Sequence, residues 1–222
     1  MSKQVFGPGA NTFARVSLLA GGLIVAIVIA IFFFSVRSPY TRVGAVTGVA
    51  IEQPVRFSHA LHAGVVNIDC RYCHLTAEYT AYGGIPDTHT CMSCHSQIAT
   101  YSEFLEPIRT SYANGTPVVW NKVHDIAEHV YFNHSIHVNK GVGCETCHGR
   151  VDQMPLVWRN NTMTMNWCLD CHQRPYQYLR PVEEVYTFGW QPEGDQNQLG
   201  MQLMAEYDIQ VDGLSDCAVC HR

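Results

Sequence analysis

Charged residues are scarce in this chain, and none of them form a basic block. Its 222 residues include 14 Lys and Arg against 19 Asp and Glu, which gives a formal net charge of -5. A surface that binds nucleic acid needs clustered cations to neutralise phosphates. The composition therefore excludes nucleic acid as the main partner.

No cysteine stands outside one repeated motif. All ten fall in five Cys-x-x-Cys-His units, the attachment signature of c-type haem. The two thiols bond the porphyrin vinyl groups, and the adjacent imidazole binds the iron. Zinc sites and thioredoxin-like pairs also use Cys-x-x-Cys, but neither requires the following histidine. We predict five covalent haems c, attached through Cys70, Cys73, Cys91, Cys94, Cys144, Cys147, Cys168, Cys171, Cys217 and Cys220, with His74, His95, His148, His172 and His221 as proximal iron ligands.

Five porphyrins are many for a chain of this length. A membrane segment leaves one compact domain of about 180 residues, so porphyrin must form much of its core. We therefore predict a multihaem cytochrome c fold that is mainly α-helical and irregular, with low regular secondary structure and long loops.

One long apolar run lies near the N-terminus. Residues 16–36 carry no charge over 21 positions, enough for a helix that crosses about 30 Å of hydrocarbon. A signal peptide is the main alternative, but its apolar region is shorter and ends at a small-residue cleavage site. Here the run ends Phe-Phe-Phe-Ser-Val-Arg. We predict an uncleaved transmembrane anchor at 16–36, after an N-terminal segment 1–15 and before a tether 37–54.

The charges that flank this run do not orient it. Lys3 and Arg15 precede it and Arg37 and Arg42 follow it, so the positive-inside count is a tie. Haem c is attached outside the cytoplasmic membrane of bacteria. We therefore predict a single-pass protein with a cytoplasmic N-terminus and a periplasmic haem domain over 55–222.

An internal repeat organises this domain. Phe-x-His-x-x-His occurs at 57–62 and again at 132–137, each time shortly before a haem motif that a second motif follows. We predict two haem-pair modules at about 57–98 and 132–172, joined by a linker at about 99–120. A terminal segment, 173–222, carries the fifth motif; its stretch before that motif covers partner surfaces or insulates the last haem.

The histidines of this element lie three residues apart. On a helical turn they share one face and are separated by about 4.5 Å along the axis. Each can therefore bind a different iron, which holds two porphyrins close together, and the preceding Phe would pack on a porphyrin face. Ordinary surface histidines would not recur at matched distances before haem motifs.

Phe-x-His-x-x-His ahead of Cys-x-x-Cys-His resembles the class III multihaem cytochromes c. The resemblance implies a distal ligand for four haems: His59 opposite His74, His62 opposite His95, His134 opposite His148, and His137 opposite His172. It also implies that His89, two residues before Cys91, binds a further haem.

The distal ligand of the haem on His221 stays open between three candidates, His89, His124 and Met165. A Met165 thioether would raise the haem potential; its alternative role is packing against porphyrin. We expect His129 to be a surface or hydrogen-bonding residue. Irons with both axial positions filled transfer electrons rather than bind substrate, so we predict a continuous electron-transfer chain that is not an enzyme on its own.

The whole pattern, with its anchor, two modules and five motifs, resembles the pentahaem cytochrome c (ActA) subunits of alternative complex III. The resemblance implies a menaquinol:electron-acceptor oxidoreductase of a bacterial respiratory or photosynthetic chain. Its partners would be a polytopic quinol-oxidising subunit, an iron–sulfur subunit and a mono-haem cytochrome c, with a soluble carrier or terminal oxidase downstream.

Two other classes fit less well. NapC/NrfH-type quinol dehydrogenases have one anchor helix, but they carry four haems and a Met two residues after the first haem-binding His, where this chain has Thr76. A reductase of nitrogen or sulfur oxyanions needs an open or Lys-ligated iron, for which the sequence gives no sign.

Overall fold

The computed structural model describes residues 7, 9–37 and 47–221. These fall into two compact units, Met1–Gly44 and Ala45–Arg222. Most of the predicted tether, at 38–46, lies outside the described residues, as do residues 1–6 and 8 of the predicted cytoplasmic segment.

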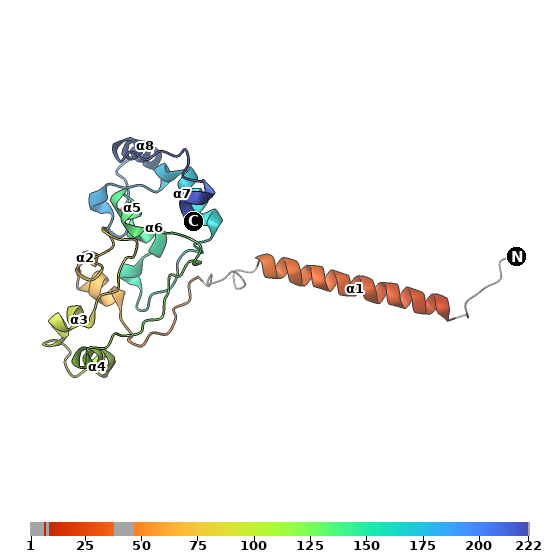
Figure 1. Ribbon diagram of the computed structural model, residues 1–222, viewed down its shortest axis with the longest axis horizontal. Coiled ribbons are helices and arrows are strands. Elements are labelled where there is room, and N and C mark those ends of the chain that lie inside the picture. The colour runs from red at the N-terminus through yellow and green to blue at the C-terminus, as the bar shows by residue number, and fades with distance from the viewer. Residues whose placement is uncertain (1–6, 8, 38–46, 222) are drawn as a thin grey trace. The chain divides into compact units, whose positions relative to one another are not determined.

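The first unit is one helix, α1 (Ala10–Arg37) (Figure 1). Its 26-residue stretch Ala10–Ser35 is long and apolar enough to cross a membrane. The most apolar part of this stretch has no residue buried against the rest of the described chain. The helix begins before the predicted start at residue 16. A signal sequence near the N-terminus meets the same criterion of length and composition, so the helix fits either an anchor or a signal.

The second unit consists of short helices joined by long irregular segments (Figure 1). Among the described residues the only β pairing is two isolated bridges, Ala50 with Trp158 and Val142 with Leu179. The predicted fold, helical and irregular with little regular structure, is confirmed. The α-helices are α2 (Cys70–Cys73), α3 (Thr88–His95), α4 (Glu106–Asn114), α5 (His134–Asn139), α6 (Cys144–His148), α7 (Met165–Gln173), α8 (Gln196–Glu206) and α9 (Cys217–Cys220); π-helix η1 covers Ala60–Val65, and 3-10 turns are η2 (Glu103–Leu105), η3 (Val151–Gln153), η4 (Pro175–Gln177) and η5 (Val182–Glu184).

Each cysteine motif forms a helical turn. A helix places residues i and i+3 on one face, so both thiols of a motif point the same way. Asp69 starts α2 by accepting a hydrogen bond from the Arg71 N–H, and Asp87 starts α3 by accepting one from Thr90. These aspartates satisfy backbone donors that the first turn leaves without partners.

Few aliphatic side chains are buried. Seven hydrophobic residues form the buried core of the described chain, which is small for a domain of this size and agrees with a core completed by porphyrin. They are Val55, Ala77, Ile108, Met154, Leu179, Val185 and Leu203.

The stretch 173–214 is neither a loose loop nor only a partner surface. It contains η4, η5 and α8, and it supplies Leu179, Val185 and Leu203 to the core. Helix α8 packs on η4. Likewise, the predicted linker at 99–120 contains α4, which packs on α3 and buries Ile108.

Gly200 allows α8 to lie directly on η4. A Cβ at this position would overlap the backbone carbonyl of Tyr176. Alanine normally strengthens a helix interior relative to glycine, yet here we expect Gly200→Ala to lower the free energy of unfolding by about 1–3 kcal/mol, because the backbone cannot yield easily. The measurement is guanidinium unfolding of the haem-loaded full chain.

Gly194, just before α8, is the control for this substitution. A Cβ there would meet nothing within 4 Å, so Gly194→Ala should leave the unfolding midpoint unchanged or slightly raised. A stabilised Gly200→Ala protein would show that α8 and η4 do not pack as closely as the structure indicates.

Candidate functional site

We number the haem sites 1 to 5 in the order of their motifs, so that site 1 holds His74 and site 5 holds His221. At sites 1 to 4 the motif imidazole faces a second imidazole across an open gap. Two imidazoles bound to one metal through bonds of about 2.0 Å have centroids about 6 Å apart. The observed centroid distances are 6.4 Å for His59–His74, 6.1 Å for His62–His95, 6.2 Å for His134–His148 and 6.2 Å for His137–His172.

The structure thus brings together the four pairs that the class III resemblance implies, and each gap has the width that one iron needs. The rings are nearly parallel at site 1, with an interplanar angle of 7°, and twisted at site 2, with 64°. Because axial ligands can rotate about the metal–nitrogen axis, both arrangements suit a bis-histidine site.

The two Phe-x-His-x-x-His elements have the same local geometry. Phe57 contacts His59 edge-on at 4.8 Å and stacks on His62 at 4.3 Å. The equivalent distances around Phe132 are 4.8 Å and 4.5 Å. In each copy the aromatic ring therefore stacks on the second distal imidazole and fixes its plane, a contact that the predicted packing on porphyrin did not include.

Backbone carbonyls orient most of the imidazoles. A ring whose Nδ1 donates to a carbonyl presents Nε2 to the metal in a fixed direction. Burial lowers the pKa of His59 to about 4 and that of His148 to about 3, which keeps both rings in the neutral form that binds metal. The Nδ1 contacts are His62 to Ser58, His74 to Gly84, His95 to Ile98, His134 to Ala81, His137 to Asn133, His172 to Leu214 and His221 to His129.

At site 5 the partner imidazole is His129, which is exposed, and whose carbonyl accepts a hydrogen bond from His221, as expected of a surface or hydrogen-bonding residue, but which was not among the predicted ligands. Its ring stacks on His221 with centroids 5.4 Å apart and an interplanar angle of 23°. The Tyr131 N–H also donates to the Cys220 carbonyl at 2.8 Å. This backbone contact holds the segment before α5 against α9 and carries His129 to the fifth motif.

Among the described residues, the ring that stacks on His221 is His129, and the three predicted candidates for site 5 lie elsewhere. The ring of His89 packs on Tyr112 of α4 at 4.8 Å. Met165 begins α7 and is 63% exposed. His124 meets His148 at 4.3 Å and 74°, too close for an iron between them.

His124 therefore lies beside site 3, whose proximal imidazole already faces His134. Burial, and then the nearby Arg159 guanidinium, lower the pKa of His124 to about 4, so its ring is neutral. Its Nε2 is buried without a hydrogen-bond partner among the described residues. This places His124 as a neighbour of the proximal imidazole.

The thiols do not behave like a redox or zinc site. All ten cysteines are free of disulfides, and burial raises the pKa of Cys144 and of Cys147 to about 12. A thioredoxin-like pair needs the opposite shift, toward the thiolate. Among the described residues no group of three or more His, Cys, Asp or Glu could hold a metal ion by itself. Buried neutral thiols are suited to thioether bonds.

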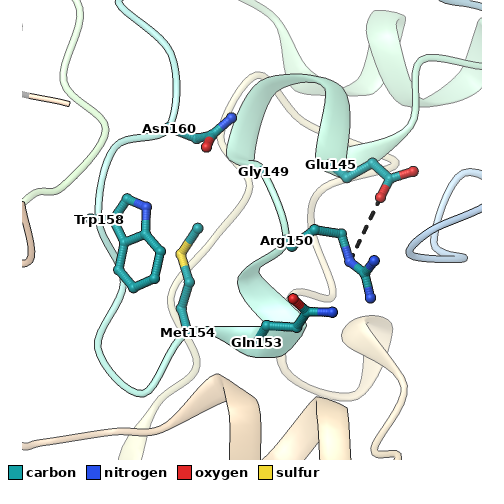
Figure 2. Close-up of a pocket in the computed structure, with 7 residues that line it drawn as sticks. All are labelled: Glu145, Gly149, Arg150, Gln153, Met154, Trp158 and Asn160. Carbon is teal, nitrogen blue, oxygen red and sulfur yellow. Dashed lines mark ion pairs between the residues drawn. The ribbon is translucent and has the colours of Figure 1, made fainter. Parts of the chain in front are cut away.

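An open pocket beside α6 is part of the scaffold (Figure 2). Its charged side chains are already paired, Arg150 with Asp152 at 2.6 Å and Glu145 with Arg180 at 2.8 Å. The ion pairs around the pocket therefore connect α6 to η3 and to the C-terminal segment. It is lined by Glu145, Gly149, Arg150, Gln153, Met154, Trp158 and Asn160.

The site 5 pairing makes a direct prediction. We expect His129→Ala to convert one of the haems to the high-spin form, because His221 loses its opposite imidazole. His124→Ala is the matched control from the same segment and should leave every haem low-spin. Electron paramagnetic resonance and visible spectra of the oxidised full chain check both. A high-spin signal in the His124 variant alone would contradict the pairing.

Two comparisons with known proteins agree with this geometry. Residues 130–222 match the family model described as cytochrome c7 and related cytochrome c. The multihaem cytochrome c subunit of menaquinone reductase from Nitratidesulfovibrio vulgaris (strain Hildenborough) is 29% identical over 142 residues, covering 54% of this chain and 68% of that protein. The chain carries a multihaem cytochrome c domain, of the cytochrome c7 type over residues 130–222, that binds c-type haems.

Proposed function

We propose that this chain is a membrane-anchored pentahaem electron-transfer subunit of a menaquinol:electron-acceptor oxidoreductase of the alternative complex III type, and not an enzyme on its own. The observation that carries this is the pairing of all five motif histidines with a second histidine. When bound, c-type haem supplies reversible one-electron transfer. With two histidines available to hold each iron, no iron would be open to a substrate.

The protein's own contribution is to position and orient. Each pair of distal histidines, such as His59 and His62, comes from one helical element and binds two successive sites, so the element fixes their spacing. The Nδ1–carbonyl hydrogen bonds fix the direction of at least one ring at each site. Because these contacts hold the imidazoles in place, little would need to reorganise when an electron arrives.

Helix α1 would hold the domain at the periplasmic side of a bacterial cytoplasmic membrane. A length of 28 residues is ample for a span of about 30 Å. We propose the partners expected for such a complex: a polytopic quinol-oxidising subunit, an iron–sulfur subunit and a mono-haem cytochrome c, with a soluble carrier or terminal oxidase beyond them. The similarity to a subunit of menaquinone reductase supports the link to menaquinone.

The same similarity favours a second candidate, in which electrons run the other way. A row of haems transfers electrons in either direction, and the potentials at its ends decide which. This chain would then serve a complex that reduces menaquinone with electrons from a periplasmic donor.

The test is gentle detergent extraction of the full chain from its native membrane, with mass spectrometry of the co-purifying subunits and assays in both directions. Menaquinol oxidation together with a polytopic subunit and an iron–sulfur subunit supports the first candidate. Menaquinone reduction by a reduced cytochrome, without menaquinol oxidation, selects the second. A chain that purifies alone and still oxidises menaquinol would instead be a NapC/NrfH-type dehydrogenase.

A further inference from the structure

We propose that the haem sites are ordered in space as 2–1–3–4–5, so that site 2 and site 5 form the two ends of the electron path. The order along the sequence would put site 1 at an end. This inference rests on the proposed electron-transfer function, and it assigns the sites at which partner proteins exchange electrons with the chain.

Sites 1 and 2 are direct neighbours. His59 and His62, three residues apart, face the proximal histidines of the two sites. A second contact joins the motifs themselves, since the hydroxyls of Tyr72 and Ser93 lie 2.8 Å apart. Tyr72 is inside the first motif and Ser93 inside the second.

Site 1, not site 2, meets the second module. The loop after the first motif holds the proximal imidazole of site 1, because His74 Nδ1 donates to Gly84. The same loop holds the distal imidazole of site 3, because His134 donates to the Ala81 carbonyl through both its backbone N–H, at 3.2 Å, and its Nδ1, at 3.1 Å. One short loop therefore touches a ligand of each site.

Two further hydrogen bonds join the loop after the first motif to α5. The Ser135 N–H donates to the Thr80 carbonyl at 3.1 Å, and the Asn139 amide donates to the Glu78 carbonyl at 2.9 Å. Helix α5 is thus bound along the loop that follows the first motif. Within the described part of the chain, α3, which carries site 2, makes no hydrogen bond to α5.

The remaining sites follow along the second module. His134 and His137 of α5 face the proximal histidines of sites 3 and 4. His172 of site 4 then donates to the carbonyl of Leu214, three residues before the fifth motif. In the ribbon, α3 and α4 lie at one end of the domain, with α2, then α5 and α6, and then α7 toward the other (Figure 1).

Pairs of methionine-ligated haems test the order. A distal His→Met substitution raises the potential of its haem above that of bis-histidine sites, so two such haems are reduced before the others. If they are neighbours, the first electron repels the second and lowers its midpoint. The variants are His59→Met with His134→Met, which marks sites 1 and 3, and His62→Met with His134→Met, which marks sites 2 and 3.

For His59→Met with His134→Met, we expect the second of the two raised midpoint potentials to be lower than in the single variants. For His62→Met with His134→Met, we expect each midpoint potential to equal that of its single variant. His59→Met with His62→Met is the calibration, since sites 1 and 2 are neighbours in either order. The readout is spectroelectrochemical titration of the detergent-purified full chain, without quinone or partner.

The reverse result, with coupling between sites 2 and 3 and none between sites 1 and 3, would establish the order along the sequence and overturn ours. Coupling in both pairs, or in neither while the calibration pair couples, would also overturn a linear 2–1–3 arrangement. If one double variant fails to accumulate, the other still shows whether site 1 or site 2 is the neighbour of site 3. A chain that shows our order but no reaction with a quinone complex would reject only the proposed function.

Discussion

Replacing His134 by Ala is expected to turn one haem high-spin and to slow electron transfer through the chain by about tenfold or more. His134 faces His148 at 6.2 Å, so its loss opens the central site and raises that haem's potential. If the electron is more stable at the central site by only about 1.4 kcal/mol, its transfer to the next site slows about tenfold. The same side chain also bonds Ala81, so contact between the two modules weakens as well.

The measurements are the spectrum of the oxidised full chain and its rate of electron transfer in the membrane complex. His89→Ala is the matched control, because the His89 ring packs on Tyr112 rather than opposite a motif histidine. That variant should keep all haems low-spin and the rate unchanged. If the His134 variant keeps its low-spin spectrum and full rate, His134 does not bind iron at site 3.

Arg180→Met is expected to lower the free energy of unfolding by about 3–5 kcal/mol, the usual cost of leaving one member of a buried ion pair without its partner. Arg180 donates to Glu145 at 2.8 Å, and the two side chains are 8% and 16% exposed. It also donates to the Thr187 carbonyl at 3.0 Å and lies over the ring of Trp190. Glu145 belongs to the third haem motif, so the pair holds the C-terminal segment against site 3.

Chemical unfolding of the haem-loaded chain, followed by haem absorbance and by circular dichroism, measures this effect. Arg174→Met is the control, because its pair with Asp170 is 49% and 41% exposed and an exposed pair contributes about 0–1 kcal/mol. Equal, small losses in both variants would mean that the Arg180–Glu145 pair is solvated in solution.

Four histidine pairs could be predicted because a Cys-x-x-Cys-His turn and a Phe-x-His-x-x-His turn each fix the relative position of their own side chains. The resemblance to class III cytochromes implied which distal histidine faces which motif, and the ring distances of 6.1–6.4 Å agree with those assignments. The scarcity of aliphatic core followed from the number of motifs.

The fifth pair could not be predicted in this way. After the repeat was assigned, His89, His124 and His129 remained, and no spacing distinguishes them as partners of His221. His129 reaches that site through a backbone hydrogen bond between Tyr131 and Cys220, residues that are far apart in the chain. His124 is sequentially close to His129, yet it packs on His148 instead.

The role of the stretch 173–214 was equally hard to predict from the sequence. Its sequence has no haem motif and suggested a loop or a partner surface, but Leu179, Val185 and Leu203 are buried in the core. Nothing in the sequence marks Arg180 as the partner of Glu145, 35 positions away. Such side chains take their role from neighbours in space, so composition alone does not reveal it.

The sequence by itself determined the class, a multihaem cytochrome c, and the five motifs that we predict as haem attachment sites, because each motif depends on positions a few residues apart. Only the tertiary structure decided which histidine faces His221, how the C-terminal segment is locked by Arg180, and the 2–1–3–4–5 order that we propose. These depend on contacts between distant segments, above all the loop 78–84 against α5.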